Sequence, residues 1–366
     1  MPEILQNTLY LLTTGTFVNR DHLTLRVEVP LYPPDLPPEE RRRETVVDWK
    51  KLSIPIHHLE SLCVFGPSTV TPPALELCWE HGVAVNFLSE FGHFQARLTG
   101  VADTSVMLRR TQFRAADDPA RAAAIARQIV AGKLQNSRNS LLRGGRENGD
   151  PGEQRQLEAA ADALARQLRD LAHPDGDARP DLDIIRGVEG AAAQTYFSIF
   201  GLLLKQQRAD FNLITRNRRP PRDPINCLLS FLYALVRHDC IAALTAAGLD
   251  PFVGFLHVDR PNRPSLALDL MEEFRPWLAD RLALTLVNRQ QIDKSHFALR
   301  EGGAVELTDS GRKLAIKSYQ ERKQENLTHP VLDQTLRLAQ IPYVQARLLA
   351  RHLRGDLADY LPFVPK

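Results

Sequence analysis

The sequence predicts an α+β protein in which a small strand-rich N-terminal domain is followed by a larger, all-helical domain. Up to about residue 103, apolar and polar residues tend to alternate, which is the period of a half-buried strand. Beyond that point apolar residues recur every three or four positions, the period of an amphipathic helix. A chain of 366 residues is also longer than one core usually supports, so we expect two domains, residues 1–103 and 104–366.

The first strands are predicted from alternating runs and the turn residues between them. Residues 23–29 alternate apolar with polar side chains, and residues 8–13 form a second β-prone run. Gly15, Asn19 and Asp21 lie between the two runs and indicate turns. We therefore expect two strands joined by an irregular connection.

Later strands and one short helix complete the predicted N-terminal domain. The proline-rich, charged segment 30–44 cannot join a sheet ladder in its middle and is expected to form an exposed loop or hairpin. Thr71 is a good helix N-cap, Pro72 suits the first helical position, and Gly82 follows the expected end. Further strands are predicted over residues 52–56, 62–65, 83–88 and 93–98.

The larger domain is predicted to consist of helices separated by loops rich in Gly, Pro and Asp. One amphipathic helix is indicated by steps of four and three between Leu157, Ala161, Leu164, Leu168 and Leu171. Further helices are predicted over residues 119–143, 182–207, 224–247, 265–287, 309–326 and 331–353. The separating loops are expected at residues 144–152, 173–181 and 216–223.

Composition is that of an ordinary globular chain, with 43% hydrophobic and 25% charged residues. The N-terminus lacks the pattern of a signal peptide, and no stretch approaches the roughly 18 apolar residues of a membrane span. The four cysteines form no C-x-x-C pair, so buried, reduced thiols in a cytoplasmic protein are expected. Because the net charge is only +2, nucleic-acid binding would depend on local basic clusters.

Three segments of the larger domain place acids or an imidazole where chemistry is possible. Glu189 lies among Gly and Ala, which leave space around a carboxylate; an exposed helix glutamate is the alternative. His257 follows an apolar run, and a structural histidine is the alternative. Asp269 and Glu272 share one face of a predicted apolar helix. Two such acids need a cation, which is either a basic residue such as Arg275 or a metal ion.

Together these segments offer carboxylate oxygens and one imidazole nitrogen. That donor set suits Mg²⁺ or Mn²⁺, and the imidazole favours Mn²⁺. Without thiolates nearby, structural zinc is not expected. Such a cation would polarise a phosphoryl oxygen and stabilise charge on an attacking or leaving oxygen.

Basic residues cluster in the same domain and suggest the substrate. The run 132–143 mixes cations with amide and hydroxyl donors, the usual contacts of a phosphate backbone, and residues 216–222 form a stiff cationic loop. For each cluster alone a solvated charged face is the alternative, but several clusters beside a candidate metal site favour a polyanion. The predicted DNA-binding residues are Lys133, Arg138, Arg143, Arg216, Arg218, Arg219 and Arg222.

A family resemblance covers essentially the whole chain. It is carried by the runs RRPPRDPINCLLSFLYALV, GLDPFVGFLH and SLALDLMEEFRP, which resemble the CRISPR-associated adaptation integrase, the first-numbered Cas protein family. The runs NTLYLLTTG, GKLQNSRNSLLR, EGAAAQTYF and ARLLARHLRGDLADYLPF match it as well. The proline-rich insert and the overall length look most like the subtype I-C branch.

The resemblance implies an N-terminal β-sandwich for dimerisation and partner binding, followed by a helical catalytic domain. Carried over residue by residue, Glu189 matches the first carboxylate ligand of the metal and His257 the imidazole ligand. Glu272 stands where many members have an Asp, which keeps the charge but lengthens the arm by one methylene. Asp269 is the companion acid, near the metal or behind its ligands, so the implied catalytic set is Glu189, His257, Asp269 and Glu272.

The activity implied by the resemblance is DNA integration. A homodimer would join the second-numbered Cas protein and insert foreign DNA into a CRISPR array, by attack of a 3′-hydroxyl on a phosphodiester. With water as the nucleophile, the same site would act as a metal-dependent nuclease. Two other interpretations remain open: an inactive DNA-binding scaffold whose acids only pair with basic residues, and a metal-dependent hydrolase of small phosphoesters.

Overall fold

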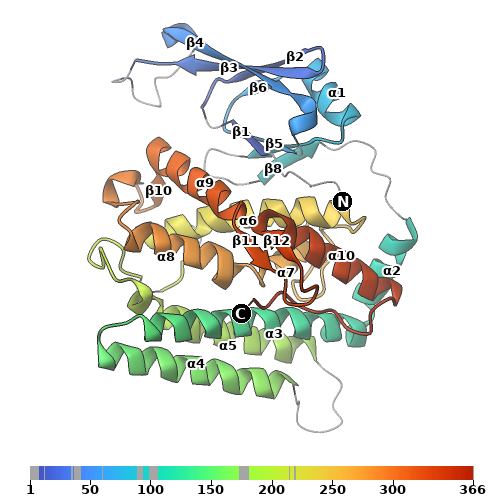
Figure 1. The fold of residues 1–366 in the computed structure, drawn as a ribbon, viewed down its shortest axis with the longest axis vertical. Helices are drawn as coiled ribbons and strands as arrows, with labels where there is room; N and C mark the ends of the chain where they lie inside the picture. The colour runs from blue at the N-terminus through green and yellow to red at the C-terminus, as the bar shows by residue number, and fades with distance from the viewer. Residues whose placement is uncertain are drawn as a thin grey trace. The chain divides into compact units, whose positions relative to one another are not determined.

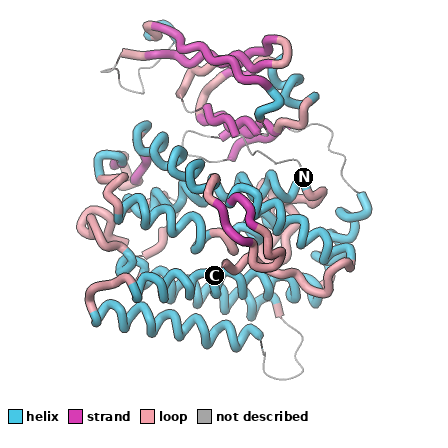
Figure 2. The backbone as a smooth tube through the Cα atoms, viewed as in Figure 1, coloured by secondary structure: helices cyan, strands magenta, loops and turns pink. Residues whose placement is uncertain are grey.

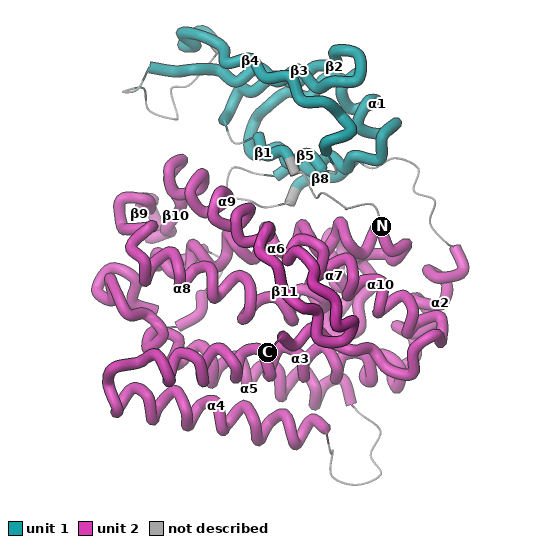
Figure 3. Tube along the Cα trace, viewed as in Figure 1, with its two compact units in different colours: residues 1–103 teal, residues 104–366 magenta. Residues whose placement is uncertain are grey.

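The computed structural model divides into two compact units, Met1–Asp103 and Thr104–Lys366 (Figure 3). The strands that the structure describes are concentrated in the first unit, and the second is mostly helical (Figure 2). This arrangement is the mixed α+β class that the change of sequence period predicts. The described residues are 8–11, 13–33, 36, 43–59, 61–88, 94–98, 106–172, 181–213, 215–217 and 220–365.

Within its described residues, the first unit contains two four-stranded sheets. The first has the order β1-β5-β7-β8, with parallel pairs except for antiparallel β7 and β8. It is built from β1 (Thr8–Leu11), β5 (Ser61–Phe65), β7 (Ala84–Leu88) and β8 (Phe94–Leu98). The second has the order β4-β3-β2-β6 and is built from β4 (Asp48–Pro55), β3 (Thr24–Leu31), β2 (Phe17–Asp21) and β6 (Thr69–Val70).

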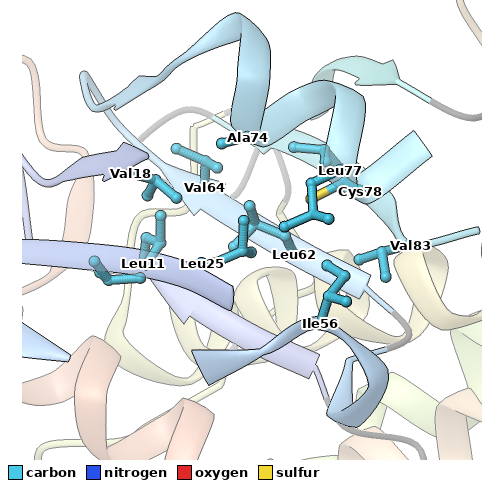
Figure 4. Packing of buried hydrophobic residues seen from close by; sticks show 12 residues of the cluster. Leu11, Val18, Leu25, Ile56, Leu62, Val64, Ala74, Leu77, Cys78 and Val83 are labelled. Atoms are coloured by element: carbon cyan, nitrogen blue, oxygen red, sulfur yellow. The ribbon is translucent and has the colours of Figure 1, made fainter. Parts of the chain in front are cut away.

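Both sheets share one hydrophobic core with helix α1 (Pro72–Glu80). Alternation along β3 turns Leu25 and Val27 into this core, where they meet residues of the other sheet such as Leu62 (Figure 4). Leu77 belongs to the same cluster and comes from α1, which begins with Pro72 and is followed by Gly82 at φ +70°. The helix predicted from Thr71 to Gly82 is therefore confirmed.

The structure corrects two local predictions in this unit. Asn19 and Asp21, interpreted as turn residues, lie in strand β2, and the turn falls at His22, whose φ is +57°. Pairing of β2 with β3 and burial of Val18 outweigh the turn propensity of the polar residues. The predicted 30–44 loop is described only in part: β3 continues to Leu31, a 3-10 turn η2 covers Arg43–Thr45, and residues 34–35 and 37–42 lie outside the described residues.

The second unit is built mainly from α-helices, with α3, α4 and α5 running side by side (Figure 1). Their bounds are α2 (Val106–Asp117), α3 (Pro119–Arg146), α4 (Pro151–Ala172), α5 (Leu182–Ser198), α6 (Pro224–Ala246), α7 (Ser265–Met271), α8 (Arg281–Asn288), α9 (Asp309–Lys323) and α10 (Ile341–Arg354). Helix α6 is long and apolar enough by composition to cross a bilayer, but 72% of its most apolar window is buried inside the unit. It is packed as a core helix.

Two predicted helices of this unit differ from the structure. The segment 265–287 is not continuous, because α7 ends at Met271 and a turn leads into a π-helical segment η5 (Arg275–Asp280) before α8. Pro276 explains the break, since it lacks an amide hydrogen and its ring blocks the preceding turn. The segment 331–353 is α-helical only from Ile341, after a 3-10 helix η7 (Leu338–Gln340). Thr335–Arg337 forms strand β12, paired with β11 (Asn326–Thr328).

The remaining differences are elements that the sequence did not predict and shifts at the ends of helices. Helix α2 and the hairpin of β9 (Phe297–Leu299) with β10 (Val305–Leu307) were not predicted. Helix α3 runs three residues beyond its expected end, and α5 stops at Ser198, where a short 3-10 helix η4 (Phe200–Leu203) follows. All four cysteines are buried and free, as the sequence predicts.

Candidate active site

Three separate segments of the second unit supply the candidate catalytic residues. Glu189 lies on α5, which begins at the N-cap Asp181, and its side chain is 27% exposed. His257 lies in the loop between α6 and α7. Asp269 lies on α7, and Glu272 occupies the turn directly after it. Because α7 ends at Met271, Asp269 lies on a helix and Glu272 lies in the turn that follows it.

Asp269 holds His257 in a fixed orientation. The Asp269 carboxylate is fully buried and accepts the backbone N–H groups of Phe255, Leu256 and His257 at 2.6, 3.0 and 3.0 Å. It also lies 2.6 Å from Nδ1 of the His257 ring. A carboxylate can only accept, so Nδ1 carries the proton and Nε2 is left as the acceptor nitrogen. Asp269 thus orients the imidazole from behind.

The loop that carries His257 approaches α7 closely at Gly254. A Cβ atom at this position would lie 2.9 Å from Asp269 Oδ2 and 2.9 Å from the backbone carbonyl carbon of Ser265. A glycine is therefore required for the loop to reach the carboxylate. Sequence reasoning missed this role of Gly254, although a glycine three residues before His257 was the available signal.

Glu272 lies at the centre of a buried group of charges. Its side chain is 1% exposed, and Oε1 lies 3.8 Å from His257 Nε2 and 3.2 Å from Arg275 Nη1. The other oxygen, Oε2, lies 2.6 Å from Lys133 Nζ. Burial by itself raises the pKa of Glu272, but the charges of Arg275 and Lys133 outweigh it and lower the pKa to about 2.

Lys133 joins the two predicted carboxylate ligands. Its ammonium pairs with Glu189 as well as with Glu272, and its side chain is only 8% exposed. This position differs from the expectation that Lys133 contacts a DNA backbone, because here the ammonium points into the acid cluster instead of onto the surface. The physical reason is that two carboxylates converging on α3 attract the cation that the helix presents.

Arg216, another predicted phosphate contact, is also used within the fold. Its guanidinium donates to Asn226 Oδ1 at 2.6 Å and to Ser230 Oγ at 3.1 Å. It also lies 5.4 Å from the centre of the Tyr233 ring. These contacts tie the cationic loop to α6, so Arg216 anchors this loop.

The remaining basic candidates are more accessible. Arg143 is about half exposed and pairs with Glu147 one turn along α3, while Arg138 is partly buried on the same helix. Arg222 is exposed just before α6. Arg218 and Arg219 lie outside the described residues.

Glu273, which the sequence did not single out, forms a second buried carboxylate beside the first. It accepts from Gln345 Nε2 at 2.9 Å, from the backbone N–H of Phe363 at 2.8 Å, and from the Tyr360 hydroxyl. Burial outweighs these neutral donors and raises the pKa of Glu273 to about 7. Asn136 bridges the same region, donating to the backbone carbonyls of Glu273 and Phe363 at 2.8 Å each. The C-terminal segment is therefore fastened to the turn that carries Glu272.

The donor chemistry of this site fits a divalent cation, although the Lys133 ammonium now lies between the two carboxylates that would bind it. Glu189, Glu272 and the Nε2 of His257 are the oxygen and nitrogen donors that Mg²⁺ and Mn²⁺ accept. Across the described part of the chain, however, no three Asp, Glu, His or Cys side chains are gathered closely enough to hold a metal ion. The ammonium of Lys133 lies where the two carboxylates meet.

Comparison with known proteins places this chain in a family. The sequence model of CRISPR associated protein Cas1 matches residues 9–321. A CRISPR-associated endonuclease Cas1 of Moorella thermoacetica is 46% identical over 362 residues, which cover 99% of both chains. These matches define the chain as a CRISPR-associated protein. It belongs to the Cas1 family.

Two solved structures share the fold at low sequence identity. A casposase bound to its integration product matches with a TM-score of 0.80 at 21% identity, covering 98% of this chain and 93% of that one. A Cas6-RT-Cas1–Cas2 complex matches with a TM-score of 0.76 at 24% identity, covering 99% of this chain and 36% of that one. The fold therefore extends over both units of the chain.

Proposed function

We propose that this protein is a divalent-metal-dependent DNA endonuclease and integrase, which inserts foreign DNA segments into a CRISPR array by attack of a 3′-hydroxyl on a phosphodiester. The observation that carries the proposal is the meeting of Glu189 and Glu272 at one ammonium, with His257 beside Glu272, in a Cas1-family chain. The Moorella thermoacetica relative is named an endonuclease, and the casposase of similar fold is bound to an integration product.

In this proposal Glu189, His257 and Glu272 would hold Mg²⁺ or Mn²⁺. When bound, the cation would supply charge that polarises a phosphoryl oxygen and stabilises the oxygens that attack and leave. Asp269 keeps the Nε2 lone pair of His257 directed away from itself by accepting the hydrogen bond of Nδ1–H, which is the usual role of a carboxylate behind a metal-bound histidine. Arg275 keeps Glu272 ionised, so that this oxygen ligand is ready at neutral pH.

The proposed partners follow the family. We propose that the protein is a cytoplasmic homodimer of subtype I-C. It would bind double-stranded and branched DNA and the second-numbered Cas protein, and it would not bind a membrane. The Cas6-RT-Cas1–Cas2 complex of similar fold supports the last partner. The strand-rich unit would then serve dimerisation and partner binding, and the helical unit would serve metal binding, DNA binding and catalysis.

The direct test is nicking and strand joining of linear and branched DNA with Mg²⁺, Mn²⁺ or EDTA. We expect both reactions with either cation and neither reaction in EDTA. Joined product in EDTA would disprove the metal dependence. Absence of both nicking and joining under every condition, with DNA binding retained, would favour the inactive scaffold. The pairing of Glu189 and Glu272 with Lys133 is the observation on which that second candidate depends.

A salt titration separates a DNA enzyme from a hydrolase of small phosphoesters. Binding to unrelated duplexes should weaken steeply with salt, with a slope near −0.9 for each phosphate contact. Replacing Arg218 and Arg219 with Ala should make this slope shallower and weaken all duplexes about equally, because phosphate contacts carry no sequence information. An unchanged slope would remove the 216–222 loop from the DNA path. Undetectable duplex binding by the intact protein would favour the hydrolase.

A further inference from the structure

Lys133 occupies an unusual position for a lysine in a helix-rich domain. Its backbone lies on α3, next to Gly132 and one turn before Asn136. The Asn136 side chain ties this helix to the backbone of Glu273 and Phe363. Its ammonium lies between the carboxylates of α5 and of the turn after α7, pairing with both while its side chain is 8% exposed. One flexible cation therefore connects three segments of the site.

Apart from the Asp269 carboxylate, which is held by hydrogen bonds, the charges of this group already balance. Glu189 and Glu272 contribute two negative charges, and Lys133 and Arg275 contribute two positive ones. The remaining pair, His257 with Asp269, is internally satisfied by hydrogen bonds. A dication added beside both cations would leave a largely buried cluster with an excess of positive charge, which is strongly unfavourable. One of the two cations must therefore leave the carboxylates when a metal ion binds.

The structure distinguishes which of the two can leave. The side chain of Arg275 is 10% exposed, and its guanidinium lies 5.0 Å from the centre of the Tyr233 ring. The guanidinium therefore contacts both the Glu272 carboxylate and an aromatic ring. Lys133 has neither a ring contact nor a third acid among its described partners, and its ammonium stands on a flexible four-carbon stem. Lys133 is the cation that can move.

We propose that Lys133 is the resident counter-cation of the metal-free site and competes with the divalent cation for Glu189 and Glu272. This inference rests on the proposed metal-dependent function and adds a positioning residue to it. Lys133 holds the two carboxylates together before the metal arrives, and it weakens metal binding because its ammonium must be displaced. Removing its charge therefore favours the metal-bound state and destabilises the metal-free protein.

The test is Mn²⁺ binding by isothermal titration calorimetry, using the full chain and the variants Lys133→Met, Lys133→Gln and Lys133→Arg. Lys133→Met and Lys133→Gln should bind Mn²⁺ at least about tenfold more tightly than the intact protein, a difference of about 1.4 kcal/mol. Lys133→Arg keeps the charge and should bind no more tightly than the intact protein. In EDTA, both neutral variants should melt at a lower temperature, and Mn²⁺ should raise their Tm more than that of the intact protein.

Lys317→Met is the matched control, because Lys317 is 74% exposed on α9 and pairs only with Glu321 among its described partners. It should leave both Mn²⁺ affinity and Tm unchanged. If Lys133→Met does not fold, Lys133→Gln decides, since its amide still donates hydrogen bonds to the carboxylates. Equal or weaker Mn²⁺ binding by Lys133→Gln overturns the inference while metal binding by the intact protein preserves the proposed function. No Mn²⁺ binding by any form overturns both.

Discussion

Two neighbouring residues, Glu272 and Glu273, carry buried carboxylates whose pKa values are shifted in opposite directions. Glu272 faces the cations Lys133 and Arg275, and its pKa is lowered to about 2. Glu273 faces neutral donors such as the Tyr360 hydroxyl, and burial raises its pKa to about 7. Both side chains are almost fully buried, so burial alone does not decide ionisation. The charge of the partners decides it.

The two carboxylates lie in one turn, between α7 and η5, but have different roles. The Glu272 side gathers charged groups from α3 and α5 and the imidazole of the His257 loop, as a site for cation chemistry requires. The Glu273 side fastens the same turn to α10 and the C-terminal segment through hydrogen bonds. Segment 341–365 lies beyond the residues matched by the family's sequence model, yet it supports the turn that carries Glu272. The comparison predicts that changes on the first side affect activity and leave buried cations unpaired, and that changes on the second side affect the dependence of stability on pH.

The largest expected effect is on activity and comes from Glu189→Ala, on the charged side. DNA nicking and joining should fall at least about 10³-fold, on the order of 4 kcal/mol, because a proposed cation ligand is removed. The fold should persist, since Glu189 is partly exposed and pairs with the flexible Lys133. DNA binding should be retained or slightly tighter, because a negative charge facing phosphate is lost. Glu321→Ala on exposed α9 is the control, and full activity in Glu189→Ala would contradict the assignment.

The second prediction compares the neighbours directly by urea unfolding at pH 7. Glu272→Gln should lower the unfolding free energy by about 3–5 kcal/mol, because it leaves the buried Arg275 without its nearest counter-charge. Glu273→Gln should cost about 1 kcal/mol, because an amide oxygen can still accept from Gln345 and from the backbone of Phe363. Equal losses in the two variants would show that partner charge does not distinguish these sites.

The third prediction concerns the pH dependence of stability. The pKa of Glu273 is about 7 in the folded protein and has an ordinary value of 4.5, so the folded state binds more protons between these values. The unfolding free energy should therefore fall as pH rises from 4.5 to 7, by up to about 3 kcal/mol at about 1.36 kcal/mol per pKa unit. Glu272 adds no slope there, since its stabilisation is complete above pH 4.5 and is lost as pH falls towards 2.

Glu273→Gln isolates this contribution. Urea unfolding of the variant and the intact protein at several values between pH 5 and pH 8 should give a flatter profile for the variant. Asp280, whose pKa is raised to about 6 by burial, remains in both proteins, so its contribution cancels in the difference. Parallel profiles would mean that Glu273 does not change its proton occupancy on folding.

The smallest expected effect comes from Asp269→Asn, which acts on His257 from behind. The amide has only one acceptor oxygen, so it cannot accept from Nδ1 of His257 and from all three backbone N–H groups at once, and the imidazole is less firmly oriented. Activity or Mn²⁺ affinity should fall about 10–100-fold. The pH profile of stability above pH 5 should keep its shape, because Glu273 is unchanged. A loss as large as that of Glu189→Ala would indicate that Asp269 itself binds the cation.

The sequence by itself determined the fold class, because periodicity is a local property. Residue chemistry singled out Glu189, His257, Asp269 and Glu272 as candidates, and the family resemblance joined them into one catalytic set. Sequence periodicity missed the break after Met271 and predicted one helix over 265–287, since the apolar pattern continues through Pro276. Local pattern also identified Lys133 only as one cation among many on a helix.

Tertiary structure decided what each charged group faces. Lys133 meets Glu189 from 56 positions away, and Tyr360 meets Glu273 from 87 positions away. Such distant pairings are absent from any local pattern, yet they set which carboxylate is ionised and which cation is buried. The reason is physical: burial removes water from a charge, and only the three-dimensional fold determines what replaces the water.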